Sequence, residues 1–328
     1  MRVALVTGAT GCLGQALCAE LAAQGVELRT LSRHEGGRPD APVARHLAMD
    51  LGAAPPPADM LEGVDVVFHC AALSSAWGRA AEFEAANIAA TRHLLEAARE
   101  ARVPRLVFAS TPSIYINGQD RLTVAEDAAL PQQFLTDYAR TKYAAEEAVR
   151  AANGPDLTTV TIRPRAIYGK HDRALMPRLL RVMERGPVPL IGGGRALIDP
   201  THNSDAARAM VLAARAPGPV AGGRAYNITS GEALPFADLV ARLAGALHVP
   251  LRTRAMPYSV AMGLARLLEG AHRVFRPSVE PLLTRHAVAA LGLSLTLDIS
   301  AARRDLCYAP QVGLADGLAD LARIYRHD

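Results

Sequence analysis

Short apolar runs alternate with longer helix-forming segments from the N-terminus to about residue 162. The strands that this pattern predicts are Val3–Thr7, Glu27–Leu31, one near His46–Met49, one that ends near Phe68 and one that begins at Arg105. Apolar runs without an alternating polar face are typical of strands buried on both sides. Between the runs, helices are predicted at residues 12–24, 82–101 and 138–152. The alternation predicts an α/β fold, with a doubly wound parallel sheet and helices on both faces.

The pattern changes after about residue 165. Helices are predicted at residues 176–185 and 204–215, with a glycine- and proline-rich stretch between them. A late strand is expected near residues 225–230, and helical segments dominate from Phe236 onward. We therefore expect residues 1–165, together with the returning strand, to form the sheet domain. Residues 166–328 are expected to form a smaller, mainly helical region that is interleaved with it.

A glycine-rich turn, Gly8-Ala-Thr-Gly11-Cys-Leu-Gly14, joins the first predicted strand to the first predicted helix. Glycines permit a tight turn and close approach to the backbone, and a helix N-terminus offers free N–H groups to a phosphate. The strand before the turn and the helix and second strand after it supply the context that this motif requires. The arrangement indicates a Rossmann-like dinucleotide-binding domain rather than an ordinary turn. The residues expected to contact the cofactor here are Gly8, Thr10, Gly11, Cys12, Leu13 and Gly14.

Tyr138 and Lys142 are four residues apart in a segment rich in strong helix formers, so both project from one helix face. The chain has only two lysines, Lys142 and Lys170, and a chance pairing at this spacing is rare. A nearby ammonium favours the phenolate of a tyrosine, which makes the phenol a usable acid or base near neutral pH. The alternative is a surface helix on which the two side chains are neighbours by accident.

These motifs together resemble the extended short-chain dehydrogenase/reductase family, also known as the NAD-dependent epimerase/dehydratase superfamily. The resemblance covers nearly the whole chain: GxxGxxG falls on Gly8, Gly11 and Gly14, and YxxxK falls on Tyr138 and Lys142. It implies that Thr111, four residues before Tyr115, is the active-site hydroxyl that acts with Tyr138 and Lys142. Ser110 and Ser113 are close enough in sequence to remain alternatives, and Ser113 is the better of the two.

The resemblance also implies further cofactor contacts, at the ends of the predicted strands. Asp50 corresponds to an acidic residue that faces the adenine, and Asp50 alone could equally be a capping residue. The full set implied beyond the glycine turn is Ser32, Arg33, Asp50, Leu51, Ala71, Ala72, Tyr138, Lys142, Pro164 and Ile167.

The second predicted strand ends without an acidic residue, in Leu31-Ser-Arg-His34. An NAD site places a carboxylate there for the ribose 2′-hydroxyl, whereas a 2′-phosphate requires a cation instead. Ser32 and Arg33 therefore favour NADP(H), with NAD(H) as the alternative if Arg33 only solvates the surface.

Composition narrows the class of protein. The net charge is +4 and the pI about 9.0, but the arginines are scattered, so nucleic-acid binding is not expected. The four cysteines form no metal-ligand spacing, so no metal is expected, and they fit a reducing cytoplasm. The first strand leaves no room for a signal peptide. The longest apolar stretch, residues 257–268, is too short to span a membrane. A peripheral membrane contact and a homodimer are both left open.

The segment from Arg163 to Leu180 looks closer to the 3β-hydroxysteroid dehydrogenase-like and 2-alkyl-3-ketoalkanoate reductase branch than to the sugar epimerases. The resemblance thus implies a cytoplasmic ketoreductase or alcohol dehydrogenase for a hydrophobic carbonyl or alcohol, such as a 3-keto acid with alkyl chains or a sterol. A nucleotide-sugar epimerase or dehydratase with bound NAD is one alternative, and a non-catalytic NADP-sensing regulator is a second. His171 and His202 are candidate substrate ligands or simple capping residues. The apolar side chains expected to line the substrate pocket are those of Met176, Leu179, Leu180, Met256 and Val260.

Overall fold

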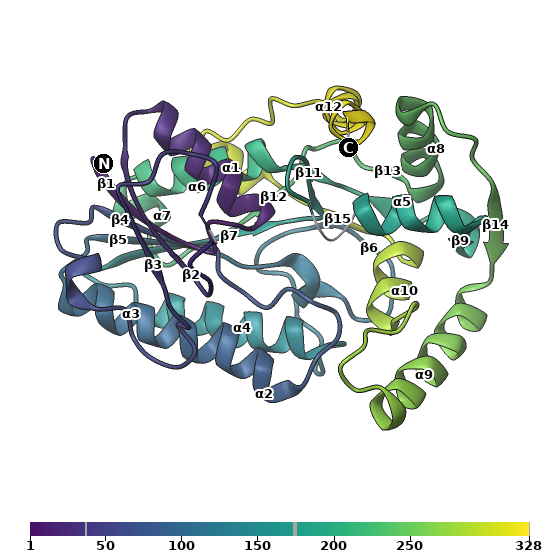
Figure 1. Cartoon of the computed structure of the whole chain (residues 1–328), viewed down its shortest axis with the longest axis horizontal. Helices are drawn as coiled ribbons and strands as arrows, with labels where there is room; N and C mark the ends of the chain where they lie inside the picture. The colour runs from purple at the N-terminus through teal and green to yellow at the C-terminus, as the bar shows by residue number, and fades with distance from the viewer. Residues whose placement is uncertain (37, 173–175, 328) are drawn as a thin grey trace.

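Seven parallel strands form the central sheet of the computed structural model, which describes residues 1–36, 38–172 and 176–327 (Figure 1). Their order across the sheet is β12-β7-β5-β4-β1-β2-β3, and every neighbouring pair is parallel. The strands are β1 (Val3–Thr7), β2 (Glu27–Ser32), β3 (Arg45–Ala48), β4 (Val66–His69), β5 (Arg105–Ala109), β7 (Thr158–Pro164) and β12 (Ala225–Ile228). The strand order reverses between β1 and β4, which is where doubly wound sheets bind ligands.

Helices cover both faces of this sheet (Figure 1). On one face lie α1 (Cys12–Ala23) and α6 (Asn203–Arg215), and on the other lie α3 (Ala90–Glu100) and α4 (Asp137–Ala151). The three-layer α/β fold predicted from the sequence is confirmed.

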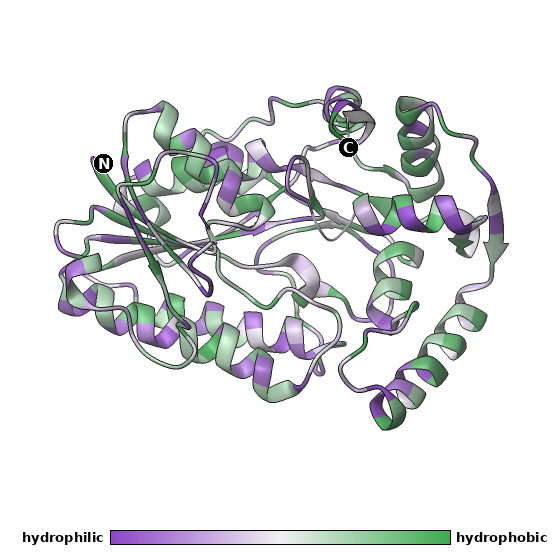
Figure 2. Cartoon of the chain, in the orientation of Figure 1, coloured by the Kyte–Doolittle hydropathy of each residue, from purple (hydrophilic) through white to green (hydrophobic). Residues whose placement is uncertain are grey.

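Strand β1 shows why the apolar runs are continuous. Ala4 and Val6 belong to the core under α1 and α6, whereas Leu5 points into the core under α3 and α4. Both faces therefore need apolar side chains, and burying one Val or Leu fully contributes roughly 1.5–3 kcal/mol. Figure 2 shows the resulting hydrophobic strands between the two helical layers.

The helix predicted at residues 82–101 differs in its first half. It begins as α2 (Ala80–Phe83), continues as the π-helical η2 (Glu84–Ala89) and only then becomes α3. Within η2, the buried Asn87 accepts a hydrogen bond from the Leu73 backbone (2.8 Å) and donates one to Thr141 on α4 (2.9 Å). The π-helical turn is accompanied by this polar link, which a 3.6-residue period does not reveal.

The remaining elements lie mainly to one side of the sheet, on the right in Figure 1. The helices there are α5 (Met176–Arg185), α8 (Phe236–Leu247), α9 (Tyr258–Phe275), α10 (Arg285–Gly292) and α12 (Leu314–His327). Paired short strands connect them: β6 (Arg121–Val124) with β15 (Leu295–Leu297), β8 (Ile167–Tyr168) with β11 (Thr201–His202), β9 (Val188–Ile191) with β14 (Thr253–Met256), and β10 (Leu197–Ile198) with β13 (Leu234–Pro235). Short helical turns complete the chain: α7 (Gly218–Ala221), α11 (Ser300–Leu306), η1 (Ala58–Met60), η3 (Pro112–Tyr115) and η4 (Gly192–Gly194). Among the described residues, no helix combines the length and apolar character that crossing a bilayer demands.

Candidate functional site

The glycine turn after β1 is fixed by two of its three glycines. Gly8 has a φ of +67°, and a Cβ there would lie 2.6 Å from the backbone nitrogen of Ala71. A Cβ on Gly14 would lie 2.1 Å from the carbonyl oxygen of Gly8. A Cβ on Gly11 meets nothing closer than 3.4 Å, so the protein's own packing does not require a glycine at that position. Gly11 is exposed at the N-cap of α1, where a ligand would make the close approach.

The first turn of α1 has the chemistry of an anion site. Backbone N–H groups of Cys12, Leu13 and Gly14 are among the first donors of the helix, which have no acceptor within it, and no side chain caps the helix. The Cys12 thiol donates to the Lys170 carbonyl (3.6 Å), and burial raises its pKa to about 12. Cys12 is therefore a packed neutral thiol beside a turn that fits the pyrophosphate of a dinucleotide.

The ends of β2 and β3 form a rim around an open depression. The Ser32 hydroxyl donates to the carbonyl of His34 (2.8 Å), and Arg33 is exposed. The depression itself is lined by residues that follow Ser32 and Arg33 in the chain, namely Glu35, Gly36, Arg38, His46, Leu47 and Ala48. Sequence reasoning missed Arg38 and His46, since neither is part of a recognisable motif. Arg38 therefore adds a second guanidinium to the one that the sequence indicated, Arg33.

Strand ends next to the glycine turn carry the other expected contacts. Exposed Asp50 accepts a hydrogen bond from the Gly52 backbone (2.9 Å), whereas Leu51 is buried and accepts one through its carbonyl from His93 (2.7 Å). Ala71 and Ala72 follow β4, where the Ala71 backbone faces Gly8. These segments flank the point at which the strand order reverses.

Thr111 and Tyr138 come together at the end of β5, where the Thr111 hydroxyl is near enough to the phenol to lower its pKa. Thr111 caps η3 by accepting from the Ser113 backbone N–H (3.2 Å), and the Thr111 and Ser113 hydroxyls are 3.1 Å apart. Ser110 donates instead to Glu146 (2.6 Å) in a buried contact. The geometry thus brings Thr111 to Tyr138, with Ser113 one hydroxyl further away.

Lys142 lies one helical turn after Tyr138 and is only 2% exposed. Its ammonium donates to the carbonyl of Ala109 (2.6 Å) and lies 3.9 Å from the centre of the Phe108 ring. Loss of solvation lowers the pKa of Lys142 to about 7. The neighbouring His69 is held neutral between the hydroxyls of Thr7 (2.7 Å) and Thr91 (2.9 Å), and burial lowers its pKa to about 3.

The electrostatics of Tyr138 differ from the sequence-based expectation. Burial raises the pKa of this phenol, and the hydrogen bond with Thr111 opposes the rise only in part. The expected lowering by Lys142 was wrong for this arrangement, because its ammonium is directed to Ala109 and Phe108. Tyr138 therefore keeps its proton at neutral pH and is prepared to donate it.

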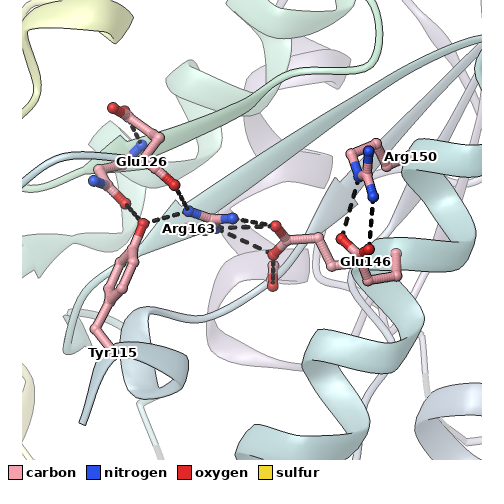
Figure 3. A network of polar contacts seen from close by, with 8 residues as sticks. Tyr115, Glu126, Glu146, Arg150 and Arg163 are labelled. Atoms are coloured by element: carbon pink, nitrogen blue, oxygen red, sulfur yellow. Dashed lines mark hydrogen bonds and ion pairs between the residues drawn. The ribbon is translucent and has the colours of Figure 1, made fainter. Parts of the chain in front are cut away.

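A buried polar network holds the helix of Tyr138 and Lys142 against the sheet (Figure 3). Glu146 on α4 accepts hydrogen bonds from Arg163 on β7, in an ion pair whose side chains are 7% exposed or less. Arg163 also donates to the hydroxyl of Tyr115 on η3, which donates to Asn227 on β12 (3.1 Å). Sequence reasoning missed this network, because its members are far apart in the chain.

The segment after β7 leads from the sheet into the smaller region. Pro164 ends β7 and Ile167 begins β8, on either side of the buried Arg165. His171 forms an ion pair with Asp40 when protonated (3.2 Å). His202 caps α6 by accepting from the Ser204 backbone (3.4 Å). Both histidines thus have local partners, as a loop or capping residue does.

The apolar residues expected in a substrate pocket are placed differently. Met176 and Leu179 are buried in a core cluster with α8 and α12, and Leu180 packs against that cluster. Met256 packs against the core beside α9, and Val260 is 57% exposed. The expectation that Met176, Leu179 and Val260 line a pocket was wrong, since apolar periodicity marks a buried helix face without saying what covers it. Residues 173–175 of the same segment lie outside the described residues.

Comparison with known proteins gives a consistent set of relatives. Residues 4–229 match the NAD dependent epimerase/dehydratase family. The chain is 35% identical over 321 residues to a 2-alkyl-3-oxoalkanoate reductase of Stenotrophomonas maltophilia (strain K279a), covering 97% of both chains. It is 30% identical over 329 residues to the human sterol-4-alpha-carboxylate 3-dehydrogenase, decarboxylating, covering 98% of this chain and 90% of that one. Its structure resembles MoeE5 in complex with UDP-glucuronic acid and NAD, with a TM-score of 0.77, 30% identity, and coverage of 100% of this chain and 99% of that one.

Proposed function

The chain belongs to the NAD dependent epimerase/dehydratase family, and we propose that it is an NADP(H)-dependent oxidoreductase that interconverts a ketone and a secondary alcohol on a hydrophobic substrate. Its reductase and dehydrogenase relatives make it an NAD(P)-dependent enzyme of the extended short-chain dehydrogenase/reductase kind. One observation carries the proposed chemistry: the hydroxyls of Thr111 and Tyr138, with Lys142 one helical turn away, meet at the carboxyl end of β5.

Each of the three residues has a distinct role in the proposal. A nicotinamide, when bound, supplies or accepts the hydride. In the reductive direction Tyr138, which keeps its proton at neutral pH, donates that proton to the substrate oxygen. Thr111 hydrogen-bonds the same oxygen and holds the carbonyl against the phenol. Lys142, on the same face of α4, holds the nicotinamide ribose.

The preference for NADP(H) rests on the rim at the ends of β2 and β3. Arg33 and Arg38 provide guanidinium groups suited to a 2′-phosphate, and Ser32 and His46 provide further polar contacts. The remaining proposed cofactor contacts are Gly8, Thr10, Gly11, Cys12, Leu13, Gly14, Asp50, Leu51, Ala71, Ala72, Tyr138, Lys142, Pro164 and Ile167.

The proposed substrate class is supported by two of the relatives that match over nearly the full chain. In both printed names the carboxylate is attached to the carbon next to the reacting carbon. One relative acts on a 3-oxoalkanoate with a 2-alkyl group, and the other on a sterol 4-carboxylate at position 3. We propose that residues 166–328 bind such a hydrophobic β-oxo or β-hydroxy acid.

A nucleotide-sugar epimerase is the second candidate. It is favoured by the structural match to MoeE5, which was solved with UDP-glucuronic acid and NAD at 30% identity to this chain. An epimerase returns the hydride to the same substrate, so it would retain its cofactor and show no net oxidation or reduction.

The decisive experiment is a substrate assay with the purified protein. A 2-alkyl-3-hydroxyalkanoate is mixed with NADP⁺ or NAD⁺, and formation of the reduced cofactor is followed by absorbance. The hydroxy acid is used because β-oxo acids lose CO₂ spontaneously. We expect oxidation that is faster with NADP⁺, and no turnover in the Tyr138→Phe variant. Epimerisation of UDP-glucose or UDP-glucuronic acid, without oxidation of any hydroxy acid, would transfer the chain to the second candidate.

A further inference from the structure

Arg165 is a buried arginine whose guanidinium has no hydrogen-bond partner among the described residues. The residue is 7% exposed, and its buried Nε is without a hydrogen-bond partner. Among the described residues, no ion pair or side-chain hydrogen bond of Arg165 is present. Its backbone, by contrast, is fixed: the N–H donates to Ile228 (3.0 Å), and the carbonyl accepts from the Thr201 hydroxyl (2.7 Å). An arginine held this firmly and left unpaired is costly unless something else binds it.

The guanidinium faces a small pocket between η3, α10 and β15. The space open in this pocket is about 10 Å³, close to what one water molecule or one carboxylate oxygen requires. Ala289, Ala290 and Leu293 line it from α10 and the residue after it, and His286 occupies the same helix face one turn earlier. The remaining lining residues are Tyr115, Ile116, Gln119, Arg121, Ser294 and Leu295.

The surroundings of Arg165 are electropositive. Burial lowers the pKa of His286 to about 4, and the charges of Arg178 and Arg165 lower it further, against an opposing effect of Glu269. Glu280 is paired with Arg178, and Glu269 is paired with Arg285. These two carboxylates therefore already have partners.

Asp199 is the remaining acidic group near Arg165. Burial raises the pKa of this carboxyl, and hydrogen bonds with Thr229 and with the backbone of Leu297 and Gly231 lower it again. Its attraction to Arg165 is felt at a distance, since no ion pair joins the two among the described residues. The guanidinium donors thus remain available to an added anion.

Two elements connect this pocket with the candidate catalytic groups. Tyr115 lines the pocket and ends the same η3 turn that Thr111 caps, and a 3₁₀ turn advances only about 2 Å per residue. Arg165 directly follows Pro164, the end of β7. The pocket is therefore linked to the candidate catalytic hydroxyls through η3 and to the proposed cofactor contact Pro164 through β7.

We propose that Arg165 binds the carboxylate of the substrate and so selects acids over neutral ketones and alcohols of the same shape. This inference rests on the proposed function and adds the residue that reads the acid group. One oxygen of the carboxylate would occupy the open space and accept a charge-assisted hydrogen bond from the guanidinium. His286 contributes a polar neighbour on the same side of the pocket.

The test compares an acid with its own ester. Oxidation of a 2-alkyl-3-hydroxyalkanoate and of its methyl ester is measured with NADP⁺, in wild type and in Arg165→Met. Hydrogen bonds from a charged donor correspond to roughly a ten- to hundredfold preference. We expect wild type to favour the acid in kcat/KM by a factor of this order, and Arg165→Met to remove the preference while retaining ester oxidation.

Arg121→Met is the matched control. Arg121 lines the same pocket, but its guanidinium already donates to the carbonyls of Tyr115 (3.1 Å) and Ala129 (2.9 Å). Arg121→Met therefore removes a positive charge from the same pocket but leaves the guanidinium of Arg165 in place. We expect the ratio of acid to ester oxidation in this variant to stay within about threefold of wild type, well inside the effect of a lost charged hydrogen bond.

Each outcome separates this inference from the proposed function. If neither acid nor ester is oxidised, the proposed function itself fails. If wild type oxidises both at equal kcat/KM, or Arg165→Met keeps the preference, the function stands and the role of Arg165 is refuted. A cooperative thermal transition of Arg165→Met is the fold control, because it shows that a lost preference reports on the guanidinium and not on misfolding.

Discussion

The ammonium of Lys142 rests 3.9 Å from the centre of the Phe108 ring, inside the sheet side of α4 rather than in solvent. An ammonium over an aromatic face gains some electrostatic attraction, but here loss of solvation dominates and lowers its pKa to about 7 from the usual 10.5. Because the pKa of Lys142 is lower in the folded chain than in the unfolded chain, this group makes the free energy of unfolding depend on pH.

The first prediction concerns that dependence in the cofactor-free protein. Between about pH 7 and about pH 10.5, the unfolded chain binds a proton at Lys142 that the folded chain has released. The free energy of unfolding should therefore rise with pH in this window, by at most about 1.4 kcal/mol per pH unit from this group. Denaturant titrations at several pH values check this. Lys142→Met should lose that component of the slope, and equal slopes in the two proteins would contradict the buried, deprotonated lysine.

The second prediction concerns the hydroxyl groups. Tyr138→Phe should lower turnover by at least roughly 10²-fold, the lower range of general acid catalysis, and leave the dissociation constant for NADP⁺ nearly unchanged. Thr111→Val should cost about tenfold more activity than Ser113→Ala, because Thr111 is the hydroxyl bonded to Tyr138. Steady-state kinetics and cofactor fluorescence titrations measure both effects. A larger loss in Ser113→Ala than in Thr111→Val would make Ser113 the active-site hydroxyl.

The third prediction separates packing from ligand binding within one turn of chain. Gly14→Ala should unfold or strongly destabilise the protein, because its Cβ would lie 2.1 Å from a backbone oxygen. Gly11→Ala should lower the free energy of unfolding by no more than about 1 kcal/mol, as expected for alanine at an N-cap. Its cofactor affinity should nevertheless fall by about tenfold or more, since the methyl group would project where a phosphate binds. Unfolding curves and cofactor titrations distinguish the two variants, and normal cofactor binding in Gly11→Ala would remove the pyrophosphate from this turn.

The fourth prediction concerns the choice of cofactor. Arg33→Ala should weaken NADPH binding by roughly ten- to a hundredfold and leave NADH binding unchanged, because only NADPH carries the 2′-phosphate. Arg38→Ala should act in the same direction. Calorimetric titration of both cofactors into wild type and variants is the measurement. Equal wild-type affinities for NADPH and NADH would show that these arginines do not read the phosphate.

Local motifs carried much of the information about the sheet and the candidate active site. The glycines at positions 8, 11 and 14 and the pair Tyr138 and Lys142 have spacings that depend on one turn or one helix. Such relationships can be predicted, because backbone geometry fixes them within a few residues.

Relationships between distant segments could not be predicted in the same way. Glu146 and Arg163 pair across two elements, and Arg165 meets the His286 side of α10 although 120 residues separate them. The apolar period of α5 indicated burial for Met176, but only the packing of α8 and α12 decides that the face is core rather than pocket. The direction of the Lys142 ammonium likewise depends on Phe108, which is in another element.

The network around Glu146 fixes the helix that carries Tyr138 and Lys142, and it involves few residues of the smaller region. Glu146 ties α4 to β5 through Ser110 and to β7 through Arg163, all within the first 165 residues. The positions of Tyr138 and Lys142 therefore depend mainly on the sheet and little on the helices that follow β8. On the proposed function, new substrate preferences can be engineered by exchanging side chains on α10, which lines the Arg165 pocket, while the reacting groups keep their positions.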